Sequence, residues 1–262
     1  MKKEIIAISG SNGFIGKHLV KRLEDWGYRI IRLDREGNLP KQVDYIFDLA
    51  SYGNFNFHTD IQEIYRANVH RVVKLLSQVK KIKGIVLTSS SSTLLPTKTF
   101  YSITKHAVEE LAKIYDLPIV VARPSTIVGT GEPEHHLIPK LINSCFTSLK
   151  MDFVKSPTHD FLAVNDYVEA IIKMAKNADK LKGKTLNVSM GKSLSNEQVK
   201  DIVEKQVGNK ASVNYVNSLR SYDTKNWKVK PAIELKRLGW KPKVKLEQVI
   251  KEMANQAWND RV

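Results

Sequence analysis

Gly10-Ser11-Asn12-Gly13-Phe14-Ile15-Gly16 is the loop from which the fold class of this chain can be read. The apolar residues before it predict a strand over 4–9, and the spacing of apolar residues after it predicts a helix over 14–26. Glycines at a strand-to-helix junction permit a tight turn and let a pyrophosphate approach the helix N-terminus. The loop therefore predicts a dinucleotide site with Gly10, Gly13 and Gly16 at its centre.

Strands and helices go on alternating as far as Pro124. The sequence predicts further strands at 28–34, 43–50, 84–90 and 117–123, and helices at 60–81 and 101–115. This alternation predicts an α/β fold of Rossmann type, with a doubly wound parallel sheet and ligands at the carboxyl ends of its strands. After Pro124 the rhythm breaks, which predicts a smaller C-terminal α+β substrate lobe.

The predicted division of the chain follows from this break in rhythm. Residues 1–124 together with about 155–190 are expected to form the dinucleotide-binding domain. Residues 125–154 and 191–262 are expected to form the substrate lobe, with a helix at 135–149 and two helices after 194. A strand at 160–164, a helix at 166–177 and a strand at 185–189 lie between these parts.

Asp34, at the end of the second predicted strand, bears on the choice of dinucleotide. A carboxylate there is placed to accept hydrogen bonds from the adenosine ribose, which favours NAD over NADP. Arg35 beside it would instead suit a 2′-phosphate, so NADP stays as the second choice. Without the glycine loop, Asp34 would be read as an ordinary acid in a turn.

Tyr101 and Lys105 are four residues apart and lie on one face of the predicted helix. An ammonium near a phenol favours the phenolate, and the positive end of the helix adds to this effect. Residues 88–93 read TSSSST at the end of the fourth strand, where one hydroxyl would bond the reacting oxygen. With Lys105 holding the nicotinamide ribose, this set predicts hydride chemistry on an alcohol or ketone.

Composition excludes several other classes of protein. The 262 residues carry a formal net charge of +15, but the lysines are scattered along the chain, which favours solvated surfaces over a nucleic-acid partner. A basic surface also suits an anionic small-molecule substrate, and no metal site is expected from the single cysteine or from His135-His136. The apolar runs are too short for a membrane span or a signal peptide, so we expect a cytoplasmic protein.

The chain resembles the extended short-chain dehydrogenase/reductase superfamily, and within it the NAD-dependent epimerase/dehydratase family of UDP-galactose 4-epimerase type. The resemblance rests on GSNGFIG at 10–16, DYIFDLAS at 44–51, FYSITK at 100–105 and ARPSTIVGTG at 122–131. It implies an NAD-dependent epimerase or dehydrogenase acting on a sugar hydroxyl, with a nucleotide sugar as the expected substrate. A keto-sugar or carbonyl reductase is the alternative within the family. A non-catalytic dinucleotide-sensing or RNA-associated protein is the alternative outside it, although such a protein has no need of the Tyr101/Lys105 pair.

The resemblance also assigns roles to individual residues. Ser90, Tyr101 and Lys105 are implied to be catalytic, with Ser89 or Ser91 replacing Ser90 if the register shifts. Cofactor contacts are expected from Gly10, Asn12, Gly13, Phe14, Ile15, Gly16, Asp34, Arg35, Leu49, Ala50, Ser51, Asn68, Thr88, Tyr101, Lys105 and Pro124. Substrate contacts are expected from Ser90, Ser91, Thr126, His136, His159 and Arg220, with Arg220 at a diphosphate.

Several departures from the family pattern affect the expected substrate. The segment between Asp34 and Asp44 is short, so the adenine pocket is expected to be more open. Thr126 and His136 replace asparagines, and His159 replaces an arginine that commonly touches the nucleotide. Ser91 and Ser92 stand where the 4,6-dehydratases need an Asp–Glu pair, which argues against dehydration.

The family further suggests a homodimer joined by the helices at 60–80 and 101–116. The first of these helices has a broad apolar face that is compatible with such an interface, but also with a buried core. The face comprises Ile61, Ile64, Tyr65, Val69, Val72, Val73 and Leu76.

Overall fold

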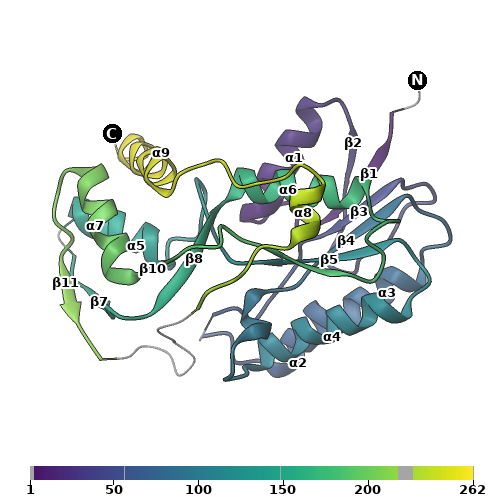
Figure 1. The fold of residues 1–262 in the computed structure, drawn as a ribbon, viewed down its shortest axis with the longest axis horizontal. Coiled ribbons are helices and arrows are strands. Elements are labelled where there is room, and N and C mark those ends of the chain that lie inside the picture. The colour runs from purple at the N-terminus through teal and green to yellow at the C-terminus, as the bar shows by residue number, and fades with distance from the viewer. Residues whose placement is uncertain (1–2, 56, 148, 218–226, 262) are drawn as a thin grey trace. The chain divides into compact units, whose positions relative to one another are not determined.

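The computed structural model describes residues 3–261 except 56, 148 and 218–226 (Figure 1). Its contacts divide the chain into two compact units. The first unit comprises residues 1–124, 168–188 and 232–240, and the second comprises 125–167, 189–231 and 241–262. Among the described helices, none combines the length and the apolar character that crossing a membrane requires.

The first unit is built on a parallel sheet of six strands in the order β2-β1-β3-β4-β5-β9. The strands are β1 (Ile5–Ser9), β2 (Arg29–Arg32), β3 (Tyr45–Asp48), β4 (Gly84–Thr88), β5 (Ile119–Pro124) and β9 (Thr185–Val188). The chain passes from β1 outward to β2 and then back to β3 on the other side of β1. This reversal of strand order creates the position at which doubly wound sheets bind ligands. The observed sheet confirms the prediction of a Rossmann-type fold.

Helices cover both faces of this sheet (Figure 1). One face carries α2 (Ile61–Tyr65), α3 (Arg71–Ser77) and α4 (Phe100–Ile114), and the other carries α1 (Phe14–Asp25) and α8 (Ile233–Arg237). The helix α6 (Val164–Lys176) begins in the second unit and continues in the first. Leucine, isoleucine and valine side chains of α3, α4 and the central strands form a continuous buried core, and burial of this kind is the main stabilising contribution.

The predicted single helix over 60–81 is in fact interrupted. Between α2 and α3, residues Arg66–His70 form a π-helical turn that contains the buried Asn68. The helix ends at Ser77 rather than at 81. The apolar face predicted for this segment also divides, because Ile64, Val72 and Leu76 are buried whereas Ile61, Tyr65 and Val73 are exposed.

Within its described residues, the second unit holds two small sheets and three helices of its own. β8 (Thr158–Ala163) pairs in parallel with β6 (Thr126–Val128) and antiparallel with β10 (Ser193–Ser195), while β7 (Met151–Phe153) pairs with β11 (Val213–Tyr215). The helices are α5 (Leu137–Thr147), α7 (Asn196–Val207) and α9 (Leu246–Asn259). A core that includes Ile138, Leu141 and Ile250 joins them. This mixed unit matches the predicted α+β lobe.

The boundaries of the units differ from the predicted division in two places. Residues 155–167 belong to the second unit, because β8 pairs with β6 and β10 rather than with the large sheet. Residues 232–240 belong to the first unit, where the backbone N–H of Ala232 donates to the carbonyl of Asn187 in β9 at 3.0 Å. The helix α8 in this segment is a third tail helix that the sequence pattern did not predict.

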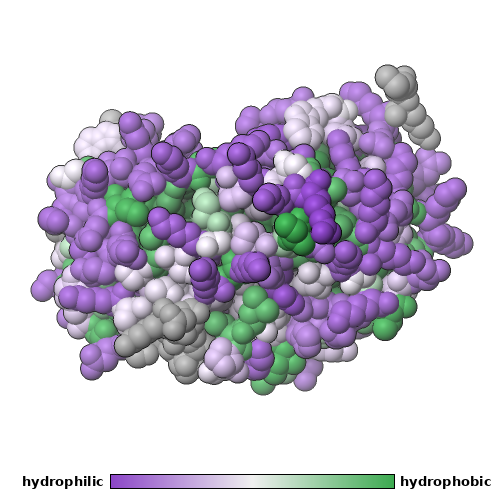
Figure 2. Space-filling model, viewed as in Figure 1, coloured by the Kyte–Doolittle hydropathy of each residue, from purple (hydrophilic) through white to green (hydrophobic). Residues whose placement is uncertain are grey.

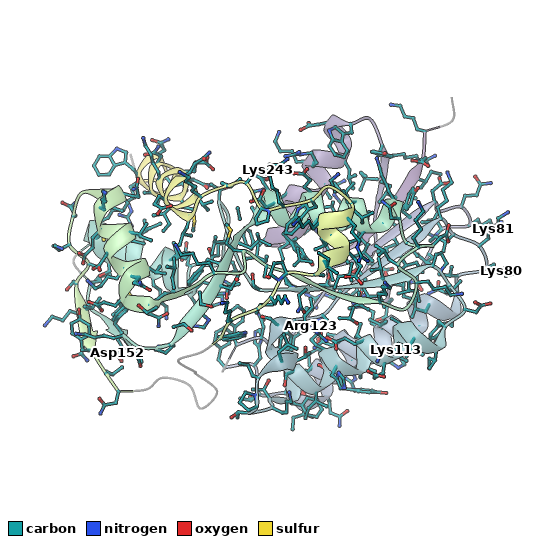
Figure 3. The ribbon with its side chains drawn as sticks, viewed as in Figure 1. Lys80, Lys81, Lys113, Arg123, Asp152 and Lys243 are labelled. Atoms are coloured by element: carbon teal, nitrogen blue, oxygen red, sulfur yellow. The ribbon has the colours of Figure 1, made fainter. Side chains whose placement is uncertain are left out.

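Hydrophilic side chains are spread over the face of the molecule that Figure 2 shows. Hydrophilic residues occupy most of the face seen in Figure 2, and Lys80, Lys81 and Lys113 project outward from the first unit in Figure 3. Lys113 is paired with Glu110 at 2.7 Å on the exposed face of α4. This distribution agrees with the expectation that the lysines lie on solvated faces.

Candidate active site

The glycine loop closes tightly between β1 and α1. Gly10 has a φ of +65°, which a residue with a side chain rarely adopts, and its carbonyl accepts the N–H of Gly13 at 3.0 Å. A Cβ atom on Gly16 would lie 2.1 Å from the carbonyl oxygen of Gly10, and one on Gly10 would lie 2.7 Å from the N atom of Ala50. The glycines are therefore required by the close approach of three backbone segments.

The start of α1 is suited to an anion. The helix begins at Phe14 after the exposed Gly13, no side chain caps it, and its first turn carries no acidic residue. Backbone N–H groups at such an end, together with the helix dipole, attract a phosphate group. Asn12 and Gly13 are exposed, while Phe14 and Ile15 are partly buried. These residues fit the pyrophosphate of a dinucleotide.

Asp34 lies beyond the end of β2 and is exposed, as is Arg35. The carboxylate of Asp34 accepts the backbone N–H of Asn38 at 3.2 Å and its side-chain amide at 3.0 Å. These hydrogen bonds hold the pKa of Asp34 below its ordinary value, so the group is a carboxylate at neutral pH. A charged acceptor at this strand end fits a ribose with free hydroxyls.

A buried ion pair supports the loop after β3. Arg71 donates to Oδ1 of Asp48 at 2.5 Å, to its Oδ2 at 3.0 Å and to the carbonyl of Ala50 at 3.1 Å. Ser9 donates to Asp48, and its Oγ accepts the N–H groups of Leu49 and Ala50 at 3.1 Å each. Burial would raise the pKa of Asp48, but Arg71 outweighs it and holds the pKa low. The loop that carries Leu49, Ala50 and Ser51 is thereby fixed beside the glycine loop.

Asn68, in the π-helical turn, links this loop to α4. Its amide oxygen accepts the N–H of Tyr52 at 3.0 Å and the hydroxyl of Ser51 at 3.3 Å. Its amide nitrogen donates to the carbonyl of Tyr52 at 2.8 Å and to Oγ1 of Thr104 at 3.0 Å. Asn68 therefore acts within the protein as a connector between the loop after β3 and the helix that carries Tyr101 and Lys105.

Tyr101 and Lys105 lie in the first two turns of α4. The start of this helix is fixed by a capping box in which Thr99 and Ser102 exchange side-chain-to-backbone hydrogen bonds. Tyr101 is partly buried, and interactions with the hydroxyls of Ser51 and Ser90 lower the pKa of its phenol. The Nζ atom of Lys105 is buried, lies 5.8 Å from the ring centre of Tyr101 and donates to the carbonyl of Thr88 at 2.8 Å.

The charge state of this pair differs from the sequence-based expectation. Burial raises the pKa of Tyr101 above its ordinary value, and the bonds from Ser51 and Ser90 only partly oppose this. Burial also lowers the pKa of Lys105 to about 8, although Asp48 opposes the shift. Lys105 is not among the groups that shift the pKa of Tyr101, and its ammonium bonds the carbonyl of Thr88.

The serines after β4 have distinct surroundings. Ser89 is buried and its hydroxyl donates to Glu109 at 2.5 Å, and Ser91 is buried as well. The Oγ atom of Ser90 accepts the N–H of Ser92 at 3.1 Å and the hydroxyl of Ser92 at 2.9 Å. With two bonds accepted, the proton of Ser90 is available to the oxygen of Tyr101. Of the three candidate serines, the geometry therefore favours Ser90.

The remaining candidates divide between the units. Pro124 ends β5 and is buried in the first unit, while Thr126, His136 and His159 belong to the second. Nδ1 of His136 lies 2.9 Å from the buried carboxylate of Glu132, whose pKa is raised by burial. His159 is buried, and its ring centre lies 5.1 Å from that of Trp227. Arg220 lies outside the described residues.

Sequence reasoning missed four charged residues near the catalytic group: Asp48, Arg71, Glu109 and Arg123. Glu109 carried a usable signal, since it lies one helical turn beyond Lys105. Arg123 carried another, because a charge within an apolar strand needs a partner. Neither signal identified the partner: Glu109 in α4 bonds Arg123 in β5, which is a different element.

Comparison with known proteins places the chain in a family. CDP-abequose synthase of Salmonella muenchen is 23% identical over 95% of this chain and 96% of that protein. GDP-6-deoxy-D-talose 4-dehydrogenase of Aggregatibacter actinomycetemcomitans is 24% identical over 74% of this chain and 77% of that protein. The structure of MoeE5 in complex with UDP-glucose and NAD matches with a TM-score of 0.89 at 22% identity, covering 98% of this chain and 99% of that one. The model of the NAD-dependent epimerase/dehydratase family matches residues 6–189, and the chain belongs to that family.

Proposed function

We propose that this protein is an NAD-dependent enzyme that oxidises or reduces a hydroxyl-bearing carbon of a nucleotide-linked sugar. The observation that carries the proposal is the position of Tyr101, which lies on the same helix as the buried Lys105, 5.8 Å from its Nζ atom to the ring centre, and whose phenol interacts with the hydroxyls of Ser51 and Ser90. A phenol held by two hydroxyls beside a dinucleotide-type loop is equipped to exchange a proton with an alcohol.

NAD is the cofactor that the residues of the first unit fit. Gly13 and the uncapped start of α1 would hold its pyrophosphate, and Asp34 would accept bonds from its adenosine ribose. The loop after β3, which the pair of Asp48 and Arg71 fixes beside the glycine loop, would line the cofactor through Leu49, Ala50 and Ser51. When bound, NAD supplies a nicotinamide that accepts or returns a hydride.

The residues of this chain would bind and transfer the proton of the sugar hydroxyl. Tyr101 as phenolate takes the proton of the sugar hydroxyl during oxidation and returns it during reduction. Ser90 donates a hydrogen bond to the same sugar oxygen and keeps it in line with the phenol. Lys105 holds the nicotinamide ribose, and its positive charge favours the phenolate once it turns from the carbonyl of Thr88.

The substrate we propose is an anionic nucleotide sugar. Relatives of this chain are named for CDP- and GDP-linked sugars, and a net charge of +15 suits a diphosphate. Thr126, His136 and His159 of the second unit, together with Arg220, are the residues we propose to contact it. A non-catalytic or RNA-associated role finds no support among the similar proteins.

Within this class, epimerisation and net reduction or oxidation remain two candidates. Relatives with names such as GDP-6-deoxy-D-talose 4-dehydrogenase favour a net redox reaction, and the family model favours epimerisation. Dehydration is disfavoured because Ser91 and Ser92 offer no carboxylate, and the hydroxyl of Ser92 is bound to Ser90.

The testing experiment has two steps. Mass spectrometry of small molecules released from the purified protein identifies any resident dinucleotide. A panel of UDP-, CDP- and GDP-linked sugars and their 4-keto forms is then offered with NAD, NADP and their reduced forms. Resident NAD with interconversion of two sugar epimers indicates an epimerase, and net consumption of free reduced cofactor indicates a reductase. Turnover with none of the nucleotide sugars would overturn the proposal.

We also propose that the protein is a homodimer in the cytoplasm. Ile61 and Tyr65 on α2 and Ile103 on α4 are large apolar side chains with about half their surface exposed. The two helices that carry them pack against each other in the first unit. Fractionation of cells would test the location, and sedimentation of the purified protein would test the dimer.

A further inference from the structure

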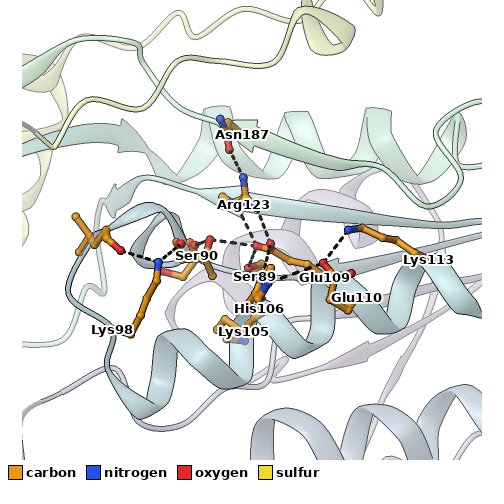
Figure 4. Close-up of polar contacts among 12 residues, drawn as sticks. Ser89, Ser90, Lys98, Lys105, His106, Glu109, Glu110, Lys113, Arg123 and Asn187 are labelled. Carbon is orange, nitrogen blue, oxygen red and sulfur yellow. Dashed lines mark hydrogen bonds and ion pairs between the residues drawn. The ribbon is translucent and has the colours of Figure 1, made fainter.

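Glu109 is a buried carboxylate in the helix that carries Tyr101 and Lys105. Its side chain is only 3% exposed, yet it accepts hydrogen bonds from four other side chains. The donors are Ser89 at 2.5 Å, Thr93 at 3.2 Å, His106 at 3.2 Å and Arg123 at 2.9 and 2.5 Å. Figure 4 shows these contacts converging on one carboxylate.

Arg123 anchors this carboxylate to the sheet. Its Nε and Nη2 atoms bond Glu109, and its Nη1 donates to the side chain of Asn187 in β9 at 3.1 Å (Figure 4). A guanidinium binding a carboxylate through two atoms fixes both its position and its orientation. Burial would raise the pKa of Glu109, but the bonds from Arg123 and Ser89 outweigh it and hold the pKa low.

The two hydroxyls that reach Glu109 flank Ser90 in the chain. Ser89 precedes it, and Thr93 follows it; the single proton of the Thr93 hydroxyl is shared between the carbonyl of Ser90 at 2.9 Å and the carboxylate of Glu109 at 3.2 Å. The backbone N–H of Ser89 is bound to the carbonyl of Ala122 at 2.8 Å, and that of Thr93 to the carbonyl of Ser90 at 3.1 Å. The segment that presents Ser90 to Tyr101 is thus tied to Glu109 from both sides.

We propose that Glu109 is a positioning residue that acts through Ser89 and Thr93 to hold the Ser90 hydroxyl against Tyr101. The inference rests on the proposed function, because it gives Ser90 a part in the reaction. A buried ion pair contributes little net stability compared with apolar packing of the same volume. Its benefit here is a fixed geometry, since a misplacement of about 1 Å at a reacting group can cost about a hundredfold in rate.

The first test compares Glu109→Gln with Glu110→Gln. Glu110 is the next residue on the same helix, but it is exposed and bonds only Lys113 and His106 among the contacts seen here. We expect E109Q to lower kcat about ten- to hundredfold, with KM and NAD affinity within about twofold of the wild type, and E110Q to change none of these. An equal effect of both variants, or no effect of E109Q on kcat, would overturn the proposal.

A double-mutant cycle with Ser90→Ala separates positioning from a general structural role. If Glu109 acts through Ser90, E109Q will lower kcat in the wild-type background but not further in the S90A background. Losses that multiply in the double variant would contradict the proposal. Thr93→Val removes the hydrogen bonds of the Thr93 hydroxyl to Glu109 and to the carbonyl of Ser90, and keeps the ion pair of Glu109 with Arg123. If E109Q does not fold, T93V takes its place in the double-mutant cycle.

Titration of Tyr101 tests the inference without a substrate. The bond from Ser90 lowers the pKa of this phenol, so E109Q and S90A should each raise it, and the double variant should raise it no further. The phenol is followed by ultraviolet titration as the difference between each variant and its Tyr101→Phe partner. An unchanged Tyr101 titration in E109Q would refute the positioning role, whereas absent sugar turnover alone would refute the proposed function.

Discussion

At the scale of single residues, the unusual group is Lys105. A lysine side chain is charged up to high pH in most proteins, but burial lowers the pKa of Lys105 to about 8. Its ammonium bonds the carbonyl of Thr88 instead of the phenol of Tyr101. Local spacing could predict that Tyr101 and Lys105 share a helix face, but the direction of the Lys105 ammonium depends on the end of β4, which is distant in the chain.

The low pKa of Lys105 predicts that NAD affinity depends on pH. The ammonium is the form that bonds the nicotinamide ribose, so affinity will fall as the pH rises above about 8. Lys105→Met should bind NAD more weakly at neutral pH, with a flatter profile. Titration calorimetry on both sides of this value checks the prediction. Parallel losses of affinity in K105M and the wild type would contradict it.

At the scale of elements, buried polar contacts determine how strands and helices meet around the site. Asn68 lies in a π-helical turn, a feature that often occurs at functional sites in place of regular helix. The apolar periodicity of residues 60–81 predicted a helix but not this turn, because the bonding partners Tyr52 and Thr104 lie far away in the sequence. The same limitation applies to Glu109 and Arg123, which meet only once α4 packs against β5.

The pair of Asp48 and Arg71 joins β3 to α3 and predicts a clear effect on stability. Arg71→Met leaves a carboxylate buried without its cation, so we expect the free energy of unfolding to fall by about 3–5 kcal/mol at neutral pH. Asp48→Asn in the same background should restore part of the loss. Urea unfolding of the three proteins checks this, and a loss below about 1 kcal/mol in R71M would refute it.

The pH dependence of this effect has a defined sign. In the wild type the pKa of Asp48 lies below its ordinary value of 3.8, so the pair stabilises at neutral pH and its contribution is lost on acidification through the folded-state pKa. In R71M burial raises the pKa of Asp48. As the pH falls, Asp48 therefore becomes protonated at a higher pH in R71M than in the wild type, and this removes the unpaired buried charge. The stability difference between the two proteins should therefore shrink as the pH falls, and a constant difference would contradict the assignment.

At the scale of the whole molecule, the sequence predicted the fold class but not the full division into units. Strands 4–9, 84–90 and 117–123 were predicted because buried parallel strands are continuous apolar runs. The strands β6, β7, β10 and β11 have three residues each, which is too short for a periodic signal. The assignment of β8 to the second unit depends on its pairing with β6 and β10, which local patterns do not encode.

The exposed apolar side chains of α2 and α4 predict the oligomeric state. The wild type should sediment as a dimer, and Ile61→Glu combined with Ile103→Glu should make it a monomer, because charges would then be buried at the interface. Ile233→Glu on α8 is a matched control, since Ile233 and Ile61 are both 53% exposed. A monomeric wild type, or equal dissociation in the control, would contradict a dimer through these helices.

The most direct test of the account is hydride transfer in a single turnover by Tyr101→Phe. A substrate found in the nucleotide-sugar panel is mixed with saturating NAD or its reduced form, and the absorbance of reduced nicotinamide is followed. We expect a rate about a hundredfold or more below that of the wild type, with NAD affinity nearly unchanged. Transfer at the wild-type rate in the variant would show that the phenol does not move the proton, and the proposed chemistry would be wrong.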